Sequence, residues 1–465
     1  MSLPARASFA YMMVSFIQKG LSFITGPIFT RLLTTEQYGQ ISIYQSWQQI
    51  FFIFASLCLS YGVFNNGMLD YRDDRDCFSF SLLILSNIAT IILASFIIIF
   101  YAWVQPYIKL AVPFEVIMFI SFMFQPAFAF WTARQRFDYK YKMVSIITIL
   151  TSILSPLIAI ILILHTNDQK VMAKIFGSEG VLIICYFVFY IRCFIKSKMK
   201  IKIDYWKYAL KFNLPLIPHY LSQIVLNSMD RLMIAALISE SAAGIYSVAY
   251  SAAAVVSVIW SSINSSLIPW TYEKCEKKAY DRIAVVTQNI VTVYAIICIM
   301  VIYMAPEIMM ILAPKSYLGG VYVIPPILGG VFFSSLYFIF ANVVYYYKSP
   351  KYVMYASVIA AISNFFLNWW LIPIFGYVAA GYTTLFSYIV QTVIDYFAMR
   401  KVVGQCIYNM KYLIALTTGV MFIALTSNLL YPHTIIRYSI LGIVIILCIV
   451  FREKIKGIIR AIKEK

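Results

Sequence analysis

The chain has 465 residues, of which 62% are apolar and only 12% are charged, and its mean hydropathy is +0.82. Soluble domains are roughly 45–50% apolar and need a polar surface that this composition cannot supply. The formal net charge is +18, but the cations lie in short segments between apolar stretches, which indicates membrane orientation rather than nucleic-acid binding. Composition therefore excludes a soluble enzyme, a secreted disulfide scaffold and a disordered protein.

The apolar stretches predict an all-α polytopic membrane protein, because a helix needs about 20 apolar residues to cross a bilayer. They are also longer than the alternating segments of about ten residues that build membrane β-barrels. We predict about fourteen spans, although the last two are short enough to leave twelve or thirteen possible. The spans are 8–33, 38–66, 77–103, 108–131, 142–165, 175–196, 209–238, 243–270, 284–311, 322–346, 351–373, 377–400, 410–430 and 434–451.

The distribution of Lys and Arg predicts the orientation of these spans. If the N-terminus lies in the cytoplasm, 29 of the 37 basic residues fall in loops or tails that face inward. The positive-inside rule therefore places both termini in the cytoplasm. After the last span, isoleucines recur on one face of residues 452–463 and cations on the other, which predicts an amphipathic helix along the inner leaflet.

The first and seventh spans match each other at an offset of 200 residues. The matching pairs are Ile17 with Ile217, Leu21 with Leu221, Ser22 with Ser222, Arg31 with Arg231 and Leu32 with Leu232, while Lys19 faces His219. Repeats of this kind are common in transporters. We predict two six-helix lobes, residues 1–200 and 201–405, related by a pseudo-twofold axis along the membrane normal. Residues 406–465 add two C-terminal helices and the tail.

Polar residues form a strip along each of these two spans. Ser15, Lys19, Ser22, Gly26 and Thr30 align in the first span, and His219, Gln223, Asn227 and Asp230 align in the seventh. A charge in the middle of a bilayer costs between about 3 and more than 10 kcal/mol, so Lys19 should face protein or water. We expect the two strips to bind substrate in a cationic central cavity. A structural ion pair between Lys19 and an acid is the alternative.

Other intramembrane charges have weaker assignments. Arg31 and Arg231 lie around the helix from the strips, so they either face the cavity or reach toward the interface. Asp230, Glu179 and Asp395 are candidates for coupling transport to protons or sodium. Asp395 also lies close enough to basic residues at positions 400 and 401 for a simple ion pair. No Cys/His spacing predicts a metal site and no phosphate-binding loop predicts ATP use, so we expect no cofactor.

Two segments resemble a known family. FNLPLIPHYLSQIVLNSMDRLMIAALISESAAGIYSVAY at 212–250 and GPIFTRLLTTEQYGQISIY at 26–44 resemble matching segments of bacterial polysaccharide-repeat-unit flippases. These flippases form the polysaccharide transporter family within the multidrug/oligosaccharidyl-lipid/polysaccharide exporter superfamily. The Asp230-Arg231 pair followed by Gly244-Ile245-Tyr246 is the most specific element.

The resemblance implies a transporter rather than an enzyme. Family members carry undecaprenyl-diphosphate-linked oligosaccharide from the inner to the outer leaflet of the bacterial inner membrane, for O-antigen, capsule or lipopolysaccharide. By this analogy Lys19, Arg31 and Arg231 would supply lumenal cations, and the polysaccharide polymerase machinery would be a partner. His219 differs from these residues because it is not a permanent cation: its protonation depends on its surroundings.

Three other functions remain as alternatives. A multidrug extrusion transporter would share the fold but needs acidic groups in its cavity, and the first six spans contain Glu179 as their one clear intramembrane acid. A membrane-embedded glycan polymerase should have a large outer loop, whereas the predicted outer loops are short. A scaffold or assembly partner that transports nothing is the third alternative.

Overall fold

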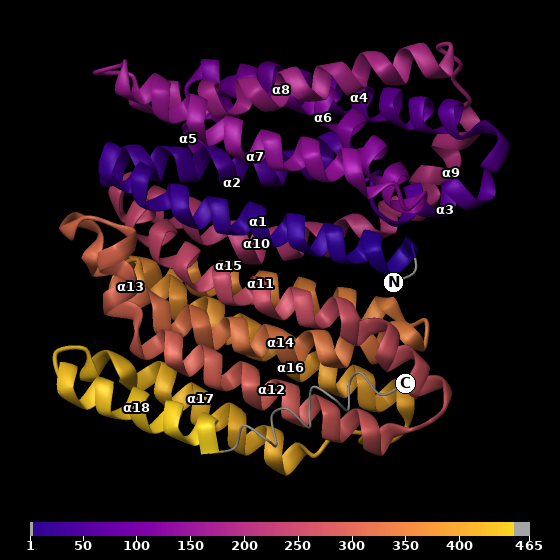
Figure 1. Ribbon diagram of the computed structural model, residues 1–465. Helices are drawn as coiled ribbons and strands as arrows, with labels where there is room; N and C mark the ends of the chain where they lie inside the picture. Colours follow the sequence, from indigo (N-terminus) through magenta and orange to yellow (C-terminus); the bar gives the residue numbers. More distant parts are fainter. Residues whose placement is uncertain (1–2, 451–465) are drawn as a thin grey trace. The chain divides into compact units, whose positions relative to one another are not determined.

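The computed structural model describes residues 3–450, except for the side chains of residues 3–5, 8, 9 and 447–450. Within that range the chain is helical and contains no strand, which confirms the predicted all-α class (Figure 1). The predicted amphipathic helix at 452–463 lies outside the described residues. Two compact units appear, Met1–Ala236 and Leu237–Lys465, and each is described by itself.

The first unit contains ten α-helices and two short 3₁₀ helices within the described residues. They are α1 (Leu3–Leu32), α2 (Thr35–Ser56), α3 (Gly62–Asp70), η1 (Arg72–Asp74), α4 (Arg75–Ile99), α5 (Tyr101–Ile108), α6 (Val112–Phe137), α7 (Tyr141–Leu164), α8 (Lys170–Ser197), α9 (Ile203–Asn213), η2 (Leu214–Leu216) and α10 (Ile217–Leu237).

The second unit has eight α-helices and one 3₁₀ helix in the described part of the chain. They are α11 (Glu240–Glu276), α12 (Tyr280–Tyr303), α13 (Ala305–Leu312), η3 (Lys315–Val323), α14 (Ile324–Tyr346), α15 (Pro350–Phe375), α16 (Val378–Val403), α17 (Met410–Leu430) and α18 (Thr434–Val450).

Local sequence explains where the second predicted span begins and ends. Thr34 and Gln37 form a reciprocal capping box at the start of α2, which satisfies two backbone N–H groups that a helix otherwise leaves unpaired. The helix stops at Ser56, because Leu57 and Cys58 have positive φ values of 48° and 52°. The predicted continuous span 38–66 is therefore wrong at its C-terminal end, where α3 forms a separate short helix.

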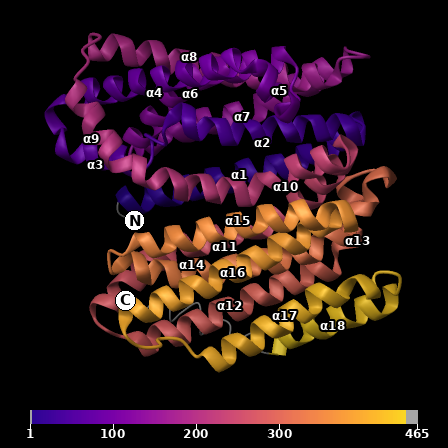
Figure 2. The same ribbon diagram turned by 180° about the vertical axis from the view of Figure 1, so that it is seen from behind.

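In the first unit α8 packs against both α6 and α7, α1 packs against α7, and α2 packs against α4. Figures 1 and 2 show α6, α7 and α8 side by side. Two apolar clusters hold these helices together. One contains Phe122 and Ile163, and the other contains Phe64, Phe78 and Phe130.

In the second unit α14 lies at the centre, since it packs against α11, α12, α16 and α17 and is buried along most of its length. The helix pairs repeat those of the first unit in chain order. The α6–α8, α7–α8 and α4–α6 pairs correspond to α14–α16, α15–α16 and α12–α14. This recurrence supports the predicted internal repeat. The compact first unit also includes residues 201–236, so the lobe boundary at residue 200 stays a prediction.

The helices fit a multi-pass membrane protein. Ten helices in the described range are long and apolar enough to cross a bilayer, and Thr434–Ile446 is a shorter apolar helix. Many large apolar side chains are exposed on these helices, for example Trp369, Trp370 and Ile184, each at least 63% exposed. Lipid contact is the environment that such a surface requires.

Candidate functional site

The candidate site is an open cavity of about 540 Å³ inside the first unit. Five helices and the α1–α2 turn supply its walls, and polar residues outnumber apolar ones. The polar lining residues are Gln18, Lys19, Ser22, Thr25, Tyr38, Gln45, Thr148, Thr151, Ser152, Ser155, Lys174 and Tyr186, and the apolar ones are Gly26, Phe29, Leu33, Ile41, Phe128, Pro156 and Leu182.

Helix α1 contributes three of the five residues of its predicted strip. Lys19, Ser22 and Gly26 line the cavity, Gln18 and Thr25 widen the polar face on one side, and Ser15 and Thr30 are outside the described lining. The side chain of Gln18 donates a hydrogen bond from Nε2 to Oγ of Ser152 at 3.1 Å, which ties α1 to α7 beside the cavity. Residues three and four apart lie on one helix face, and the packing of α1 against α7 places this face at the cavity.

A run of hydroxyls on α7 forms the opposite wall. Thr148, Thr151, Ser152 and Ser155 recur at intervals of three and four residues and therefore share one face of the helix. Thr151 donates to the carbonyl of Ile147 at 2.9 Å, and Ser152 donates to that of Thr148 at 2.6 Å. With their protons engaged by the backbone, these oxygens remain available to accept hydrogen bonds from sugar hydroxyls.

Helix α8 places a second ammonium group in the cavity. Lys174 lies 4.6 Å from the ring centroid of Phe29, and its Nζ donates to Oγ of Ser178 at 3.3 Å. A cation over an aromatic face is partly stabilised without a counter-ion. Lys174 can therefore remain charged in the wall of a membrane-embedded cavity.

Lys19 has no hydrogen bond or ion pair with any residue that the structure describes, and its side chain is exposed. The described residues therefore show no structural ion pair between Lys19 and a carboxylate, which was the alternative. No acidic side chain is among the described lining residues, so the two ionisable groups in the lining, besides the tyrosines, are both basic. Two ammonium groups surrounded by hydroxyls suit an anion that also carries hydrogen-bonding groups.

The other predicted binding residues lie elsewhere in the first unit. His219, Gln223, Asn227 and Arg231 are on α10 and do not line this cavity. On α10, Arg231 donates from Nη1 to the carbonyl of Asn227 at 3.2 Å, and Asn227 donates from Nδ2 to that of Gln223 at 2.7 Å.

Arg31 is also outside the described lining of the cavity, at the end of α1. Its Nη1 donates to the carbonyl of Pro27 at 2.8 Å, and the side chain is exposed. The contact is therefore with the preceding turn of its own helix, and a place for Arg31 at the cavity or at the interface stays a prediction.

The three candidate acids have different surroundings. Glu179 is buried on α8 and accepts a hydrogen bond of 2.9 Å from Nε2 of Gln48, with Lys174 on the same helix. Asp230 is buried on α10. Asp395 is fully buried on α16, and neither carboxylate oxygen has a hydrogen-bond partner in the described part of the chain. The expected ion pair of Asp395 with basic residues at 400 and 401 is absent from those described contacts.

Sequence reasoning missed Lys174 and the hydroxyls of α7. Lys174 precedes the predicted span 175–196, whereas α8 begins at Lys170 and carries Lys174 into the helix. The period of Thr148, Thr151, Ser152 and Ser155 is a readable signal, but isolated hydroxyls in a membrane helix more often contact their own backbone. Only the packing of α7 against α1 and α8 shows which of these hydroxyls line a cavity.

Comparisons with known proteins agree with the fold. The family model described as "Polysaccharide biosynthesis protein" matches residues 5–274, more than half of the chain. The Lsg locus putative protein 1 of Haemophilus influenzae is 23% identical over 76% of this chain and 88% of its own length. An uncharacterised membrane protein of the same organism is 21% identical over 76% of this chain and 86% of its own length.

Two solved structures share the architecture. The lipid II flippase MurJ in an inward closed conformation has a TM-score of 0.66 and 15% identity, covering 95% of this chain and 99% of its own. An inward-facing multidrug resistance MATE transporter of the MOP superfamily has a TM-score of 0.58 and 11% identity, covering 83% and 95%. Identities this low establish the fold alone. The chain therefore belongs to the polysaccharide biosynthesis protein family and is a multi-pass helical membrane protein with the fold of these transporters.

Proposed function

We propose that this chain is a flippase that moves undecaprenyl-diphosphate-linked oligosaccharide repeat units from the inner to the outer leaflet of the bacterial inner membrane. Both termini would face the cytoplasm, and the exported glycan would serve O-antigen, capsule or lipopolysaccharide synthesis. Contact with polysaccharide polymerase machinery on the outer side belongs to the same proposal. Membership in the polysaccharide biosynthesis protein family and the fold shared with a lipid flippase support it.

The observation that carries the proposal is the pairing of Lys19 and Lys174 in one hydroxyl-rich cavity. A diphosphate needs cations, and the attached sugars need hydrogen-bonding groups and aromatic surfaces on which to lie. Phe29, Phe128 and Tyr186 supply such surfaces in the same wall. A polyprenyl tail can stay in the lipid while the polar head is held by these groups.

Alternating access of two lobes, residues 1–200 and 201–405, would move the headgroup between leaflets. The substrate can shift the equilibrium between the two conformations only if it binds them with different affinities. In this proposal Arg31, His219, Gln223, Asn227 and Arg231 contact the substrate in a conformation in which α10 borders the transport path.

The energy source is proposed to be a proton or sodium gradient, with Glu179, Asp230 and Asp395 as the candidate coupling groups. Asp395 has the strongest support, because a buried anion without a partner is costly while a protonated carboxyl or a bound cation is not. Glu179 already accepts a hydrogen bond from Gln48, which lowers the cost of its burial as an anion.

The test is reconstitution of the purified chain in proteoliposomes with a fluorescent lipid-linked oligosaccharide. We expect the fluorophore to become accessible to an added quencher on the opposite leaflet, with no new glycosidic bond in the recovered lipid. Lys19→Glu and Lys174→Glu should abolish this transfer. The matched control Lys142→Glu changes an exposed lysine of α7 that does not line the cavity, and it should retain transfer.

Other outcomes would assign a different function. Growth of the glycan into polymer would indicate a polymerase. Efflux of cationic drugs without glycan transfer would indicate a multidrug extrusion transporter. The fold shared with a MATE transporter is compatible with that function. The charge of the cavity opposes that reading, since two lysines repel cationic drugs and the described lining contains no acid.

A further inference from the structure

A second cavity, of about 310 Å³, lies in the first unit beside the C-terminal part of α8. It is formed by the start of α4, the C-terminal halves of α6 and α8 and the α6–α7 turn, and the described residues show no side chain shared with the first cavity. The lining residues are Asp76, Ser79, Ala127, Phe130, Trp131, Arg134, Gln135, Asp138, Lys140, Phe189, Arg192, Cys193 and Lys196. Four cations and two carboxylates give this lining a net charge of +2.

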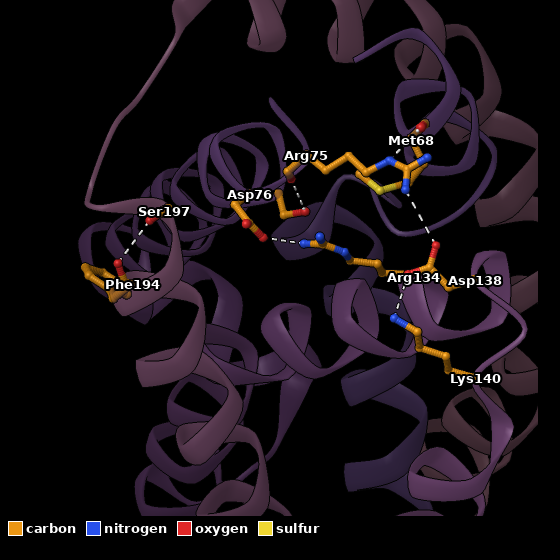
Figure 3. Close-up of polar contacts among 9 residues, drawn as sticks. Met68, Arg75, Asp76, Arg134, Asp138, Lys140, Phe194 and Ser197 are labelled. Atoms are coloured by element: carbon orange, nitrogen blue, oxygen red, sulfur yellow. Dashed lines mark hydrogen bonds and ion pairs between the residues drawn. The ribbon is translucent and has the colours of Figure 1, made fainter. Parts of the chain in front are cut away.

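The two carboxylates are already engaged by cations, as Figure 3 shows. Arg134 pairs with Asp76 through Nη1, while Asp138 lies 3.5 Å from Nη1 of Arg75 and 3.7 Å from Nζ of Lys140. Arg75 is held in turn by the carbonyl of Met68 and the ring of Phe137. These contacts engage both carboxylates and leave them little capacity to neutralise further cations.

Arg192 and Lys196 form the uncompensated part of the cavity. They lie one turn apart on α8, so both side chains emerge from the same helix face. Both are exposed, and neither has an ion pair or hydrogen bond with any residue in the described range. Repulsion between two neighbouring cations costs energy that an anion bound between them would remove.

The remaining wall is aromatic. The ring centroids of Trp131 and Phe189 lie 4.3 Å apart, and Phe130 lines the cavity beside them. Tryptophan at the end of a membrane helix is typical of the depth at which lipid headgroups meet acyl chains. The cavity therefore combines unpaired cations with an apolar wall, which is the pairing that an amphiphile with a phosphate head would recognise.

We propose that this cavity is a binding site for the phosphate of an anionic membrane lipid. Arg192 and Lys196 would contact the phosphate oxygens, with Arg134 held beside them by Asp76, and the lipid chain would lie against Trp131 and Phe189. The positive-inside prediction places this end of the helices at the inner leaflet. The proposal does not depend on what the first cavity transports.

The experiment uses the full chain, purified and placed in nanodiscs or detergent with defined phosphatidylglycerol or phosphatidylcholine. Bound lipid is measured by native mass spectrometry and by the rise in melting temperature as lipid is added. The test variant is Arg192→Gln/Lys196→Gln. The matched control, Lys198→Asn/Lys200→Gln, removes two cations just beyond α8 that do not line the cavity. Asn is chosen at 198 because that residue has a φ of 51°.

We expect the test variant to bind phosphatidylglycerol about thirtyfold more weakly, because it removes two cations that each contribute about fivefold near a headgroup. The control should change less than about threefold. Equal losses in both variants, or no loss in the test variant, would overturn the proposal. Trp131→Leu and free inorganic phosphate distinguish the source of the ligand. If the site binds lipid, Trp131→Leu should bind less phosphatidylglycerol, and millimolar phosphate should not displace the lipid. If free phosphate displaces the lipid and Trp131→Leu binds it as the wild type does, the lipid assignment is overturned.

Discussion

Lys19 on α1 and Lys174 on α8 line the same cavity of the first unit, although they are far apart in the sequence. Lys19 has no partner among the described residues, whereas Lys174 lies against Phe29 and Ser178. The more exposed and unpaired ammonium group is therefore the better placed to bind an incoming anion.

This arrangement predicts unequal effects of substitution. Lys19→Gln should reduce lipid-linked glycan transfer about 10- to 100-fold, as expected for loss of a hydrogen bond to a charged group. Lys19→Arg should retain most of the transfer, because it keeps the charge. Initial rates in proteoliposomes measure both, with the amount of folded protein determined by size-exclusion chromatography. Equal rates for Lys19→Gln and wild type would remove Lys19 from substrate binding.

The hydroxyl face of α7 predicts an effect on the sugar but not on the diphosphate. Thr148→Val and Ser152→Ala should each weaken binding of the lipid-linked oligosaccharide about two- to tenfold, the range for a neutral hydrogen bond. Binding of polyprenyl diphosphate without sugar should not change. Fluorescence titration of both ligands measures this, with Thr417→Val on α17 as the control. A loss for both ligands would contradict a role in sugar recognition.

In the second unit Arg437 of α18 forms a bidentate ion pair with Glu307 of α13. Its Nη2 and Nη1 lie 2.7 Å and 2.9 Å from the two carboxylate oxygens, and it also donates to the carbonyl of Tyr303. Arg437→Met should destabilise the chain by about 2 kcal/mol, because the partly buried Glu307 carboxylate loses two charge-assisted hydrogen bonds and keeps only that from Tyr438. Thermal unfolding of the purified protein measures the loss. Adding Glu307→Gln to Arg437→Met should recover part of it.

The same pair predicts a dependence of stability on pH. Hydrogen bonds from Arg437 hold the pKa of Glu307 below its ordinary value, and partial burial opposes them. A lowered pKa contributes stability above the ordinary glutamate value of about 4.3, and that contribution is lost as pH falls through the folded pKa. The difference in melting temperature between wild type and Glu307→Gln should therefore be full at pH 7 and shrink below pH about 4. A constant difference across this range would contradict the assignment.

Substitution of Asp395 should affect the coupling of transport to an ion gradient without affecting folding. Both of its oxygens are buried without hydrogen-bond partners in the described range, so Asp395→Asn should fold with equal or higher stability. If the carboxyl carries the coupling ion, an imposed proton or sodium gradient should no longer accelerate transfer in this variant. Asp281→Asn, at an exposed site on α12, is the control. Unchanged acceleration in Asp395→Asn would exclude Asp395 from coupling.

Several features of the fold could be predicted from periodicity and charge, and others could not. The stretch 142–165 became α7 (Tyr141–Leu164) almost residue for residue, because an uninterrupted apolar segment in a membrane satisfies its backbone only as a helix. The stretch 284–311 broke at Met304, where α12 ends and α13 begins. Hydropathy does not register a break between two helices that are both apolar.

The sequence by itself determined that this protein is a helical, multi-pass membrane protein and that Lys19 belongs to a polar helix face. Length, hydropathy and helical spacing are local properties, so they can be read one segment at a time. Only the tertiary structure decided that Lys174 and the α7 hydroxyls join Lys19 in one cavity, while Arg31 and the polar strip of α10 lie outside it. The reason is that a cavity depends on which faces of distant helices pack together, and that packing is a property of the whole unit.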